Sequence, residues 1–334
     1  MKGKLKIRAD AGAEIGYGHI MRCISLAHML KNDFEIHFYS MNLPENLHKE
    51  IESESWKIYE IDEEEDFLST LNDNEIVVID GYHFDSDYQK EIKKKGSILV
   101  CIDDFHAQHF YADLVINHAP GITEDQYEGE PYTKYLLGPG YALLRPEFLE
   151  SNGIKSRKNR NEIKHLFICF GGSDAKNLTC NILEWLPVEN FEVTVVVGSA
   201  YTHIDELNEV INKRNDLRIK VKRSLTAKEI RKEMIQADLG IVPSSGILFE
   251  VLSTKLPVIT GFYTENQKDV YEGFVKMGSV IGSDEFQKKK LQDILTKVSY
   301  KNTTTNFQSQ HDIIDNNSQY RIRQVFLKYG ISKN

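Results

Sequence analysis

Short apolar runs recur along the chain, and most are followed by a segment in which apolar residues have helical spacing. Residues 19–31 place Ile20, Ile24 and Ala27 on one face, with the i, i+3, i+4 spacing of an amphipathic helix. The runs predict strands at residues 5–8, 34–39, 76–80, 97–102 and 114–117. Runs that are apolar on both faces are typical of parallel strands covered by helices. The pattern therefore predicts an α/β sheet with right-handed crossovers.

The same alternation restarts in the second half, after a polar and basic segment, SNGIKSRKNRNEIK, at residues 151–164. The segment is predicted to be an interdomain linker. Five further strands are predicted at residues 165–170, 192–197, 217–222, 238–242 and 257–260. We therefore expect an N-terminal domain at 1–150 and a C-terminal domain at 160–315. A final helix, in 316–334, is expected to pack back on the N-terminal domain.

Charge and cysteine content narrow the function classes. Among 334 residues, 41 Lys and Arg face 50 Asp and Glu, so the formal charge is −9. Such a chain is a poor partner for nucleic acid, although a local site can still hold a small anion. There is no run of ~20 apolar residues for a membrane span and no secretory signal at the start. Four cysteines lie far apart without a C-x-x-C pair. We expect buried thiols in a cytoplasmic protein that needs neither nucleic acid nor membrane.

A glycine-rich segment, RADAGAEIGYGHIMR at residues 8–22, joins the first strand to the first helix. Its spacing is not G-x-G-x-x-G, and G-K-[ST] occurs nowhere, so both nucleotide-binding motifs are rejected. Gly16 and Gly18 allow a ligand to approach the backbone and place His19 at a helix N-terminus. The helix dipole there favours the neutral imidazole, which is a competent general base near pH 7. The alternative is that His19 only caps the helix.

Two loops in the second half favour an anion. Gly172 and Ser173 follow the strand at 165–170, and Ser245 and Gly246 follow the strand at 238–242. Both precede helical segments, whose N-terminal amides attract phosphate groups. Ordinary turn chemistry explains each loop equally well when it is taken alone. Together they suit a diphosphate.

Several blocks of the sequence carry a resemblance to a known family. They are DAGAEIGYGHIMRC at 10–23, IDGY at 79–82, CIDDF at 101–105, GPGYALLRPEF at 138–148, CFGGSDAKN at 169–177, PSSGILFEV at 243–251 and ENQK at 265–268. In this order they resemble the UDP-2,4-diacetamido-2,4,6-trideoxy-β-L-altropyranose hydrolases of pseudaminic acid biosynthesis. That family is similar to the MurG-type glycosyltransferases.

The resemblance implies two Rossmann-like domains with an interdomain cleft, which is the glycosyltransferase-B architecture. It also implies that water attacks the anomeric carbon of a UDP-sugar with inversion, releasing UDP and the free sugar. Neither a metal nor a cofactor is implied, and the enzyme is expected to be a monomer. A MurG-like glycosyltransferase that uses a UDP-sugar donor is the alternative, and a non-catalytic nucleotide-sugar binding protein is a third possibility.

The resemblance also implies roles for individual residues. His19 matches the base that activates water, Tyr82 matches a tyrosine near that water, and Asn266 matches an asparagine that reaches the substrate. Glu250 matches a glutamate that accepts hydrogen bonds from the ribose, and Gln267 is assigned to the sugar and phosphate groups. For Glu250 the alternative is a solvated helix residue, and for Asn266 and Gln267 it is a polar loop.

Other features are weaker. The family often has His before the tyrosine, where this chain has Gly81. Arg223 and Ser224 follow a predicted strand at a place where the base could bind. Asp103, His106 and His109 superficially resemble a metal site, but a polar loop at the end of a strand is the favoured interpretation. Neither a G-x-S-x-G elbow nor a reactive-cysteine arrangement is present, which disfavours a covalent intermediate on Ser or Cys.

Overall fold

The computed structural model describes residues 2–12, 15–150, 162–188, 191–298 and 313–330. The chain divides into two compact units. Unit 1 comprises Met1–Pro146 and Asn317–Asn334, and unit 2 comprises Glu147–Asn316. Residues 151–161 of the predicted linker lie outside the described residues, and so do residues 299–312.

Unit 1 is built on a parallel sheet with the strand order β3-β2-β1-β4-β5-β7-β9. These strands are β1 (Gly3–Ala9), β2 (Phe34–Ser40), β3 (Lys57–Glu60), β4 (Ile76–Asp80), β5 (Ile98–Ile102), β7 (Leu114–Asn117) and β9 (Lys134–Leu137). A small separate pair is formed by β6 (His109–Phe110) and β8 (Glu128–Gly129). The helices are α1 (Gly18–Leu30), α2 (Glu45–Ser53), α3 (Glu64–Thr70), α4 (Ser86–Lys94), α5 (Pro146–Leu149) and α13 (Ser318–Gly330), with short 3-10 turns η1 (Glu124–Gln126) and η2 (Pro139–Tyr141).

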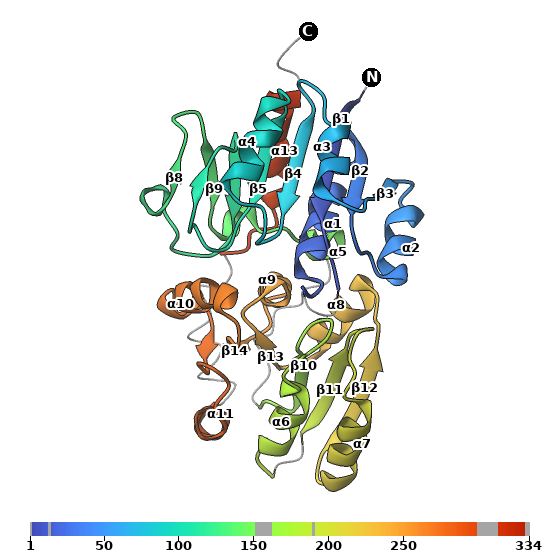
Figure 1. Ribbon diagram of the computed structural model, residues 1–334. Coiled ribbons are helices and arrows are strands. Elements are labelled where there is room, and N and C mark those ends of the chain that lie inside the picture. Colours follow the sequence, from blue (N-terminus) through green and yellow to red (C-terminus); the bar gives the residue numbers. More distant parts are fainter. Residues whose placement is uncertain (1, 13–14, 151–161, 189–190, 299–312, 331–334) are drawn as a thin grey trace. The chain divides into compact units, whose positions relative to one another are not determined.

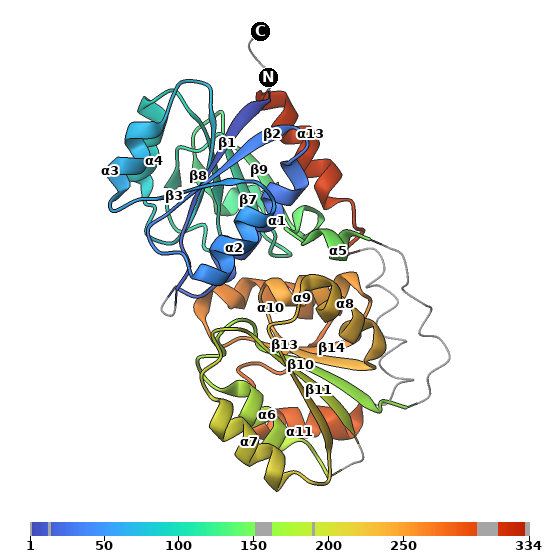
Figure 2. The same cartoon turned by 90° about the vertical axis from the view of Figure 1, so that its right-hand side faces the viewer.

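Helices cover both faces of this sheet. Figure 2 shows α3 and α4 on one face, and α1 and α13 on the other. All five residues of β4 are buried, as expected for a central strand between two helical layers. The sheet extends from β1 in two directions: β2 and β3 lie on one side of it, and β4 and the later strands lie on the other. That reversal is the topological switch point, where doubly wound folds bind their ligands.

Unit 2 repeats the plan with the order β12-β11-β10-β13-β14-β15, again parallel throughout. Its strands are β10 (His165–Cys169), β11 (Glu192–Val197), β12 (Arg218–Arg223), β13 (Leu239–Pro243), β14 (Val258–Gly261) and β15 (Ile281–Gly282). Its helices are α6 (Leu178–Trp185), α7 (Ile204–Lys213), α8 (Ala227–Gln236), α9 (Gly246–Ser253), α10 (Lys268–Lys276) and α11 (Lys288–Lys297), with the 3-10 turn η3 (Glu265–Gln267). Figure 1 shows both sheets and their helices.

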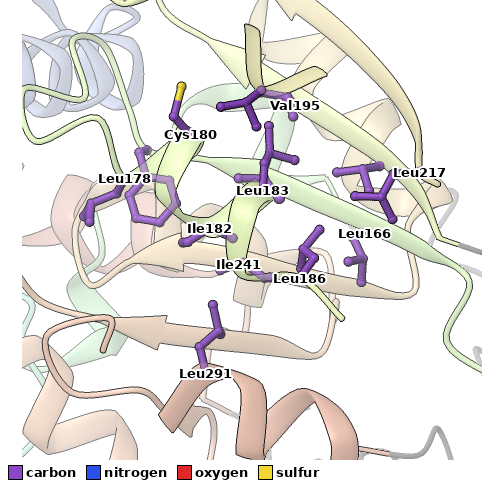
Figure 3. Close-up of a cluster of buried hydrophobic side chains, with 14 of the residues drawn as sticks. Leu166, Leu178, Cys180, Ile182, Leu183, Leu186, Val195, Leu217, Ile241 and Leu291 are labelled. Atoms are coloured by element: carbon purple, nitrogen blue, oxygen red, sulfur yellow. The ribbon is translucent and has the colours of Figure 1, made fainter. Parts of the chain in front are cut away.

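A hydrophobic core lies between the unit 2 sheet and the helices α6, α7 and α11. Figure 3 shows Ile182 and Leu183 of α6 beside strand residues such as Val195, with Leu291 of α11 in the same core. Each of these side chains is at most 1% exposed. At ~25 cal/mol per Å² of apolar area, burying one such side chain contributes ~1.5–3 kcal/mol. This layer holds the strand ends that carry the unit 2 loops.

The C-terminal helix α13 packs in unit 1, far in sequence from its neighbours. Its Arg323 donates to both oxygens of Asp33, at 2.6 and 2.7 Å, just beyond the end of α1. Its Phe326 is fully buried. At Gly330, a Cβ atom would lie 2.7 Å from the ring of Phe34, so only glycine allows this approach. The chain end therefore supports the helix that carries His19.

The predicted strands are confirmed, with ends that shift by at most two residues. Edge strands such as β3, β9 and β15 were missed. An edge strand has one unpaired side and needs fewer apolar residues, and β3 (KIYE) is mostly exposed. The four cysteines are buried, as expected. Within the described ranges, we find no helix that combines the length and the apolar character needed to cross a membrane.

Candidate functional site

Polar side chains meet where the central strands of unit 1 end. Asp80 is the last residue of β4 and pairs in register with Ala9 at the end of β1. His19 is the second residue of α1 and is 5% exposed. Its Nδ1 lies 2.6 Å from Oδ1 of Asp80. A carboxylate can only accept, so Nδ1 carries the hydrogen and Nε2 of the neutral ring is left as an acceptor.

Arg22 lies one turn further along α1 and joins the buried carboxylate of Asp80 to the half-buried carboxylate of Asp104. It donates to Asp80 through Nε at 2.5 Å and Nη2 at 2.7 Å, and to Asp104 through Nη1 at 2.6 Å. Burial alone would raise the pKa of Asp80, but Arg22 and His19 outweigh it and hold that pKa well below its usual range. At Asp104, burial would also raise the pKa, and Arg22 outweighs it, so the pKa is lowered. Both groups are therefore charged at neutral pH.

Tyr82 contacts both His19 and Asp104. Its ring meets the His19 ring edge-on, with centroids 4.5 Å apart, and 52% of the residue is exposed. Its hydroxyl donates to Asp104 at 2.8 Å. Burial, followed by Asp104, raises the pKa of Tyr82 far above its ordinary value, so the hydroxyl keeps its hydrogen. The structure thus brings the predicted residues His19 and Tyr82 together.

The loop before His19 is tightly closed. Gly12 and Gly16 exchange two backbone hydrogen bonds, of 3.2 and 2.8 Å. Gly16 has φ +82°, a conformation that suits glycine, and a Cβ at Gly16 or Gly18 would meet nothing within 4 Å. Open space at these two positions is compatible with the close ligand approach predicted for them. Tyr17, which precedes α1, makes no side-chain capping bond.

A second cluster of polar side chains, which contains one histidine, lies near the end of β1. Among the described residues, Asp10, Glu64 and His83 form the group whose ligand atoms are close enough to share a metal ion. Arg8 already bonds both carboxylates, each at 2.6 Å. A guanidinium satisfies these carboxylates and repels a second cation. The residues present therefore do not fit a metal centre well.

The grouping of Asp103, His106 and His109 is held by other contacts. Asp103 accepts from the Tyr127 hydroxyl at 2.9 Å and from the His106 backbone amide at 2.8 Å. His109 pairs with Glu130 through Nε2 at 3.0 Å. These contacts are those of the polar loop favoured from the sequence.

In unit 2, the first predicted phosphate loop is partly self-satisfied. Asp174 is 3% exposed and accepts hydrogen bonds from the amides of Leu178 and Thr179, at 2.9 and 2.8 Å. These amides open α6, so its N-terminus is already capped by a carboxylate. Gly172 and Ser173 lie just before this cap. A Cβ at Gly198, after β11, would come within 2.3 Å of the Gly172 carbonyl oxygen, so that loop depends on a glycine that sequence reasoning missed.

The second predicted phosphate loop has no such carboxylate cap. Ser245 precedes α9 in an extended conformation and makes no side-chain capping bond. A Cβ at Gly246 would meet nothing within 4 Å. Glu250, one turn into α9, is 7% exposed, so the alternative of a solvated helix glutamate is wrong. The loop is held at its start, where the Ser244 amide donates a hydrogen bond to the Gly261 carbonyl oxygen at 2.8 Å.

The remaining predicted residues of unit 2 differ in their surroundings. Gln267 is 5% exposed and its side-chain oxygen accepts from the Tyr263 amide at 3.1 Å, so this oxygen holds the loop after β14. Asn266, its neighbour in η3, is half-buried. Arg223 donates to the Ser199 carbonyl at 3.3 Å, and Ser224 adopts φ +52°. The nucleotide roles of these residues stay predictions.

Sequence reasoning missed Asp80, Arg22 and Asp104 as site residues. A usable signal existed for each of them. Asp80 ends an apolar strand, and Asp104 lies two residues after the end of another. Arg22 is three residues after His19, on the same side of the helix. All three residues lie inside the sequence blocks that carry the family resemblance.

Comparison with known proteins places these features in context. No protein-family model matches the chain. An uncharacterized protein of Methanocaldococcus jannaschii is 31% identical over 284 residues, which are 82% of this chain but only 58% of that relative. The UDP-2,4-diacetamido-2,4,6-trideoxy-β-L-altropyranose hydrolase of Campylobacter jejuni is 26% identical over 281 residues, covering 82% of this chain and 97% of that enzyme. The spore coat polysaccharide biosynthesis protein SpsG of Bacillus subtilis is 24% identical over 286 residues, 82% of each chain.

Solved structures agree in fold. MurG of Acinetobacter baumannii superposes with a TM-score of 0.67 at 11% identity, covering 97% of this chain and 99% of MurG. HepE of Anabaena, solved with UDP and glucose, gives a TM-score of 0.58 at 11% identity, covering 99% and 100%. The predicted pair of Rossmann-like domains of the glycosyltransferase-B type is confirmed, and so is the resemblance to the hydrolase and to MurG.

Proposed function

We propose that this protein hydrolyses a UDP-linked diacetamido-trideoxy sugar, releasing UDP and the free sugar. The observation that carries the proposal is the hydrogen bond between His19 and the buried Asp80, in a chain related to an enzyme with that activity. A carboxylate behind a histidine fixes its tautomer and stabilises the imidazolium that forms when the ring takes a proton. The pair is therefore suited to activate water.

In the proposed reaction, Nε2 of His19 removes a proton from water as the water oxygen bonds to the anomeric carbon. The bond between that carbon and the phosphate oxygen breaks, and its electron pair leaves with UDP. Attack from the opposite side inverts the anomeric centre. A general base of this kind contributes ~10²–10⁴ in rate.

Unit 2 is proposed to hold the UDP group. The start of α9 at Gly246, where the Ser245 side chain makes no capping bond, suits a phosphate, and Glu250 one turn later suits the ribose hydroxyls. Gly172 and Ser173 are proposed as additional backbone contacts, and Asn266 and Gln267 as contacts to the sugar and phosphate. Fixed backbone dipoles of this kind stabilise a leaving diphosphate without reorganising.

The deciding experiment incubates the purified protein with UDP-2,4-diacetamido-2,4,6-trideoxy-β-L-altropyranose and no other substrate. We expect stoichiometric release of UDP and free sugar, followed by coupled UDP assay and by NMR of the anomeric proton. UDP release that starts only after a sugar or lipid acceptor is added would instead identify a glycosyltransferase, the activity of MurG-like neighbours of this fold. Binding of the UDP-sugar without turnover in either assay would identify a binding protein.

A further inference from the structure

Arg22 is the common partner of the two reactive side chains in unit 1. Its Nη2 lies 3.3 Å from Nδ1 of His19, and Asp80 accepts hydrogen bonds from both residues. Through Asp104, Arg22 also reaches the hydroxyl of Tyr82. The His19 and Tyr82 rings touch, so the contacts form a closed circuit of five side chains. In a planar guanidinium the donors are fixed relative to each other, which fixes the two carboxylates relative to each other.

The circuit sets the direction of every hydrogen bond in it. Asp80 and Asp104 can only accept, because their pKa values are held low. Nδ1 of His19 and the hydroxyl of Tyr82 must therefore donate to them. What each presents to a ligand is then a lone pair, on Nε2 of His19 and on the oxygen of Tyr82.

We propose that Arg22 is a positioning residue that makes His19 and Tyr82 a pair of hydrogen-bond acceptors for one water molecule. A water that donates one hydrogen to each side chain keeps its oxygen lone pairs for the anomeric carbon. Arg22 also neutralises Asp80, which on its own would favour the protonated and inactive imidazolium. This inference rests on the proposed function.

Arg8 provides a matched comparison within the same unit. Arg8 is fully buried, and it too joins two carboxylates, Asp10 and Glu64, beside a histidine, His83. Arg8 pairs with Asp10 and Glu64, whereas Arg22 pairs with Asp80 and Asp104, so each arginine should govern its own histidine. The charged and titratable groups around His19 are Asp80, Arg22, Asp104, Tyr82, Cys23 and His118.

The first test follows histidine protonation by NMR in protein labelled with ¹⁵N-histidine, assigning His19 by its loss in H19Q. In Arg22→Met, two carboxylates lose their cation, and we expect His19 to take up its proton at a pH higher by at least one unit, about tenfold in proton affinity. In Arg8→Met, His83 should shift and His19 should not. An unshifted His19 in Arg22→Met, or an equal shift in both variants, would overturn the proposal.

The second test needs no change at Arg22, whose loss can impair folding. Asp104→Asn, Tyr82→Phe and the double variant are compared in kcat for UDP release. We expect each single variant to lose about a hundredfold, as for a misplaced reacting group, and the double variant to be no slower than Tyr82→Phe. Full additivity would show that Asp104 does not act through the Tyr82 hydroxyl and would contradict the inference.

The two tests separate this inference from the proposed function. If the unaltered protein releases no UDP, hydrolysis is wrong, yet the NMR titration still decides whether Arg22 controls His19. If UDP is released but His19 titrates alike in Arg22→Met and Arg8→Met, the proposed hydrolysis is supported and the proposed role of Arg22 is wrong. Thermal unfolding of each variant, compared with that of the unaltered protein, shows which variants are folded.

Discussion

The carboxyl ends of the two parallel sheets carry opposite kinds of polar group. In unit 1, that edge is lined by ionised side chains, with Arg22 between Asp80 and Asp104 and Arg8 between Asp10 and Glu64. In unit 2, the corresponding loops before α6 and α9 are rich in Gly and Ser, and Asp174 is the carboxylate that caps α6. In the proposed function, the same fold supplies proton chemistry in one unit and backbone amides in the other. An acidic chain can attract a diphosphate in this way because helix N-termini carry local positive potential whatever the net charge.

A second contrast lies inside unit 2, between the starts of α6 and α9. Asp174 accepts from the first amides of α6, whereas Ser245, the residue before α9, makes no side-chain capping bond. A carboxylate and a phosphate compete for the same donors. Of the two loops, the α9 loop is therefore the better candidate for a phosphate that comes and goes.

The largest expected effect is at His19. Replacing His19 with Gln should lower kcat for UDP release by about 10³-fold, because the base is lost. UDP affinity, measured by calorimetry, should change less than about twofold, since the nucleotide is assigned to unit 2. A variant that keeps its turnover would remove His19 from the mechanism.

Ser245→Asp should separate stability from binding. An aspartate at this position can cap α9, as Asp174 caps α6, and should raise the free energy of unfolding by up to about 1 kcal/mol. The same charge should repel the diphosphate and weaken UDP binding by about tenfold or more. Ser245→Ala serves as the control without charge. Unchanged UDP affinity in Ser245→Asp would place the diphosphate elsewhere.

Asp174→Ala tests the other helix. Losing this cap leaves two amides of α6 without their partner, which should lower the free energy of unfolding by ~1–2 kcal/mol in chemical denaturation. UDP affinity should fall little. Tighter UDP binding in Asp174→Ala would instead mean that the freed α6 amides receive the phosphate, and would reverse the comparison of α6 with α9.

The smallest expected effect concerns metal. Treatment with EDTA should leave the rate of UDP release unchanged within error, because Arg8 already neutralises Asp10 and Glu64 and the proposed base is His19. The assay compares EDTA-treated protein with and without added Mg²⁺. Strong inhibition that Mg²⁺ reverses would direct attention to Asp10, Glu64 and His83 as ligands.

Much of the fold could be read from the sequence, because buried parallel strands are apolar along their whole length. The run Ile76–Asp80 is an example, and its strand was found in full. Edge strands such as β3, with one solvent-exposed side, lack that signal. The glycine segment likewise indicated His19 as a candidate site residue, since glycines between a strand and a helix are unusual unless the backbone must turn tightly.

The partners of His19 could not be read in the same way. The sequence favoured a neutral histidine through the helix dipole alone, but the structure adds a buried carboxylate on one side and an arginine behind it. Asp80 is 61 residues from His19 in sequence, and Asp104 is 82 from Arg22. Spacing within a motif carries no information about such pairs.

By itself, the sequence determined the alternation of strands and helices, the two halves and the placement of His19 and Ser245 at helix starts. These are local properties, set by apolar periodicity and by glycine. Only the tertiary structure decided which carboxylate orients His19, that Arg22 connects it to Tyr82, and that Asp174 closes α6 while α9 stays uncapped. Those outcomes depend on which strand ends lie next to each other in the sheet, and strand order is a long-range property of the packed core.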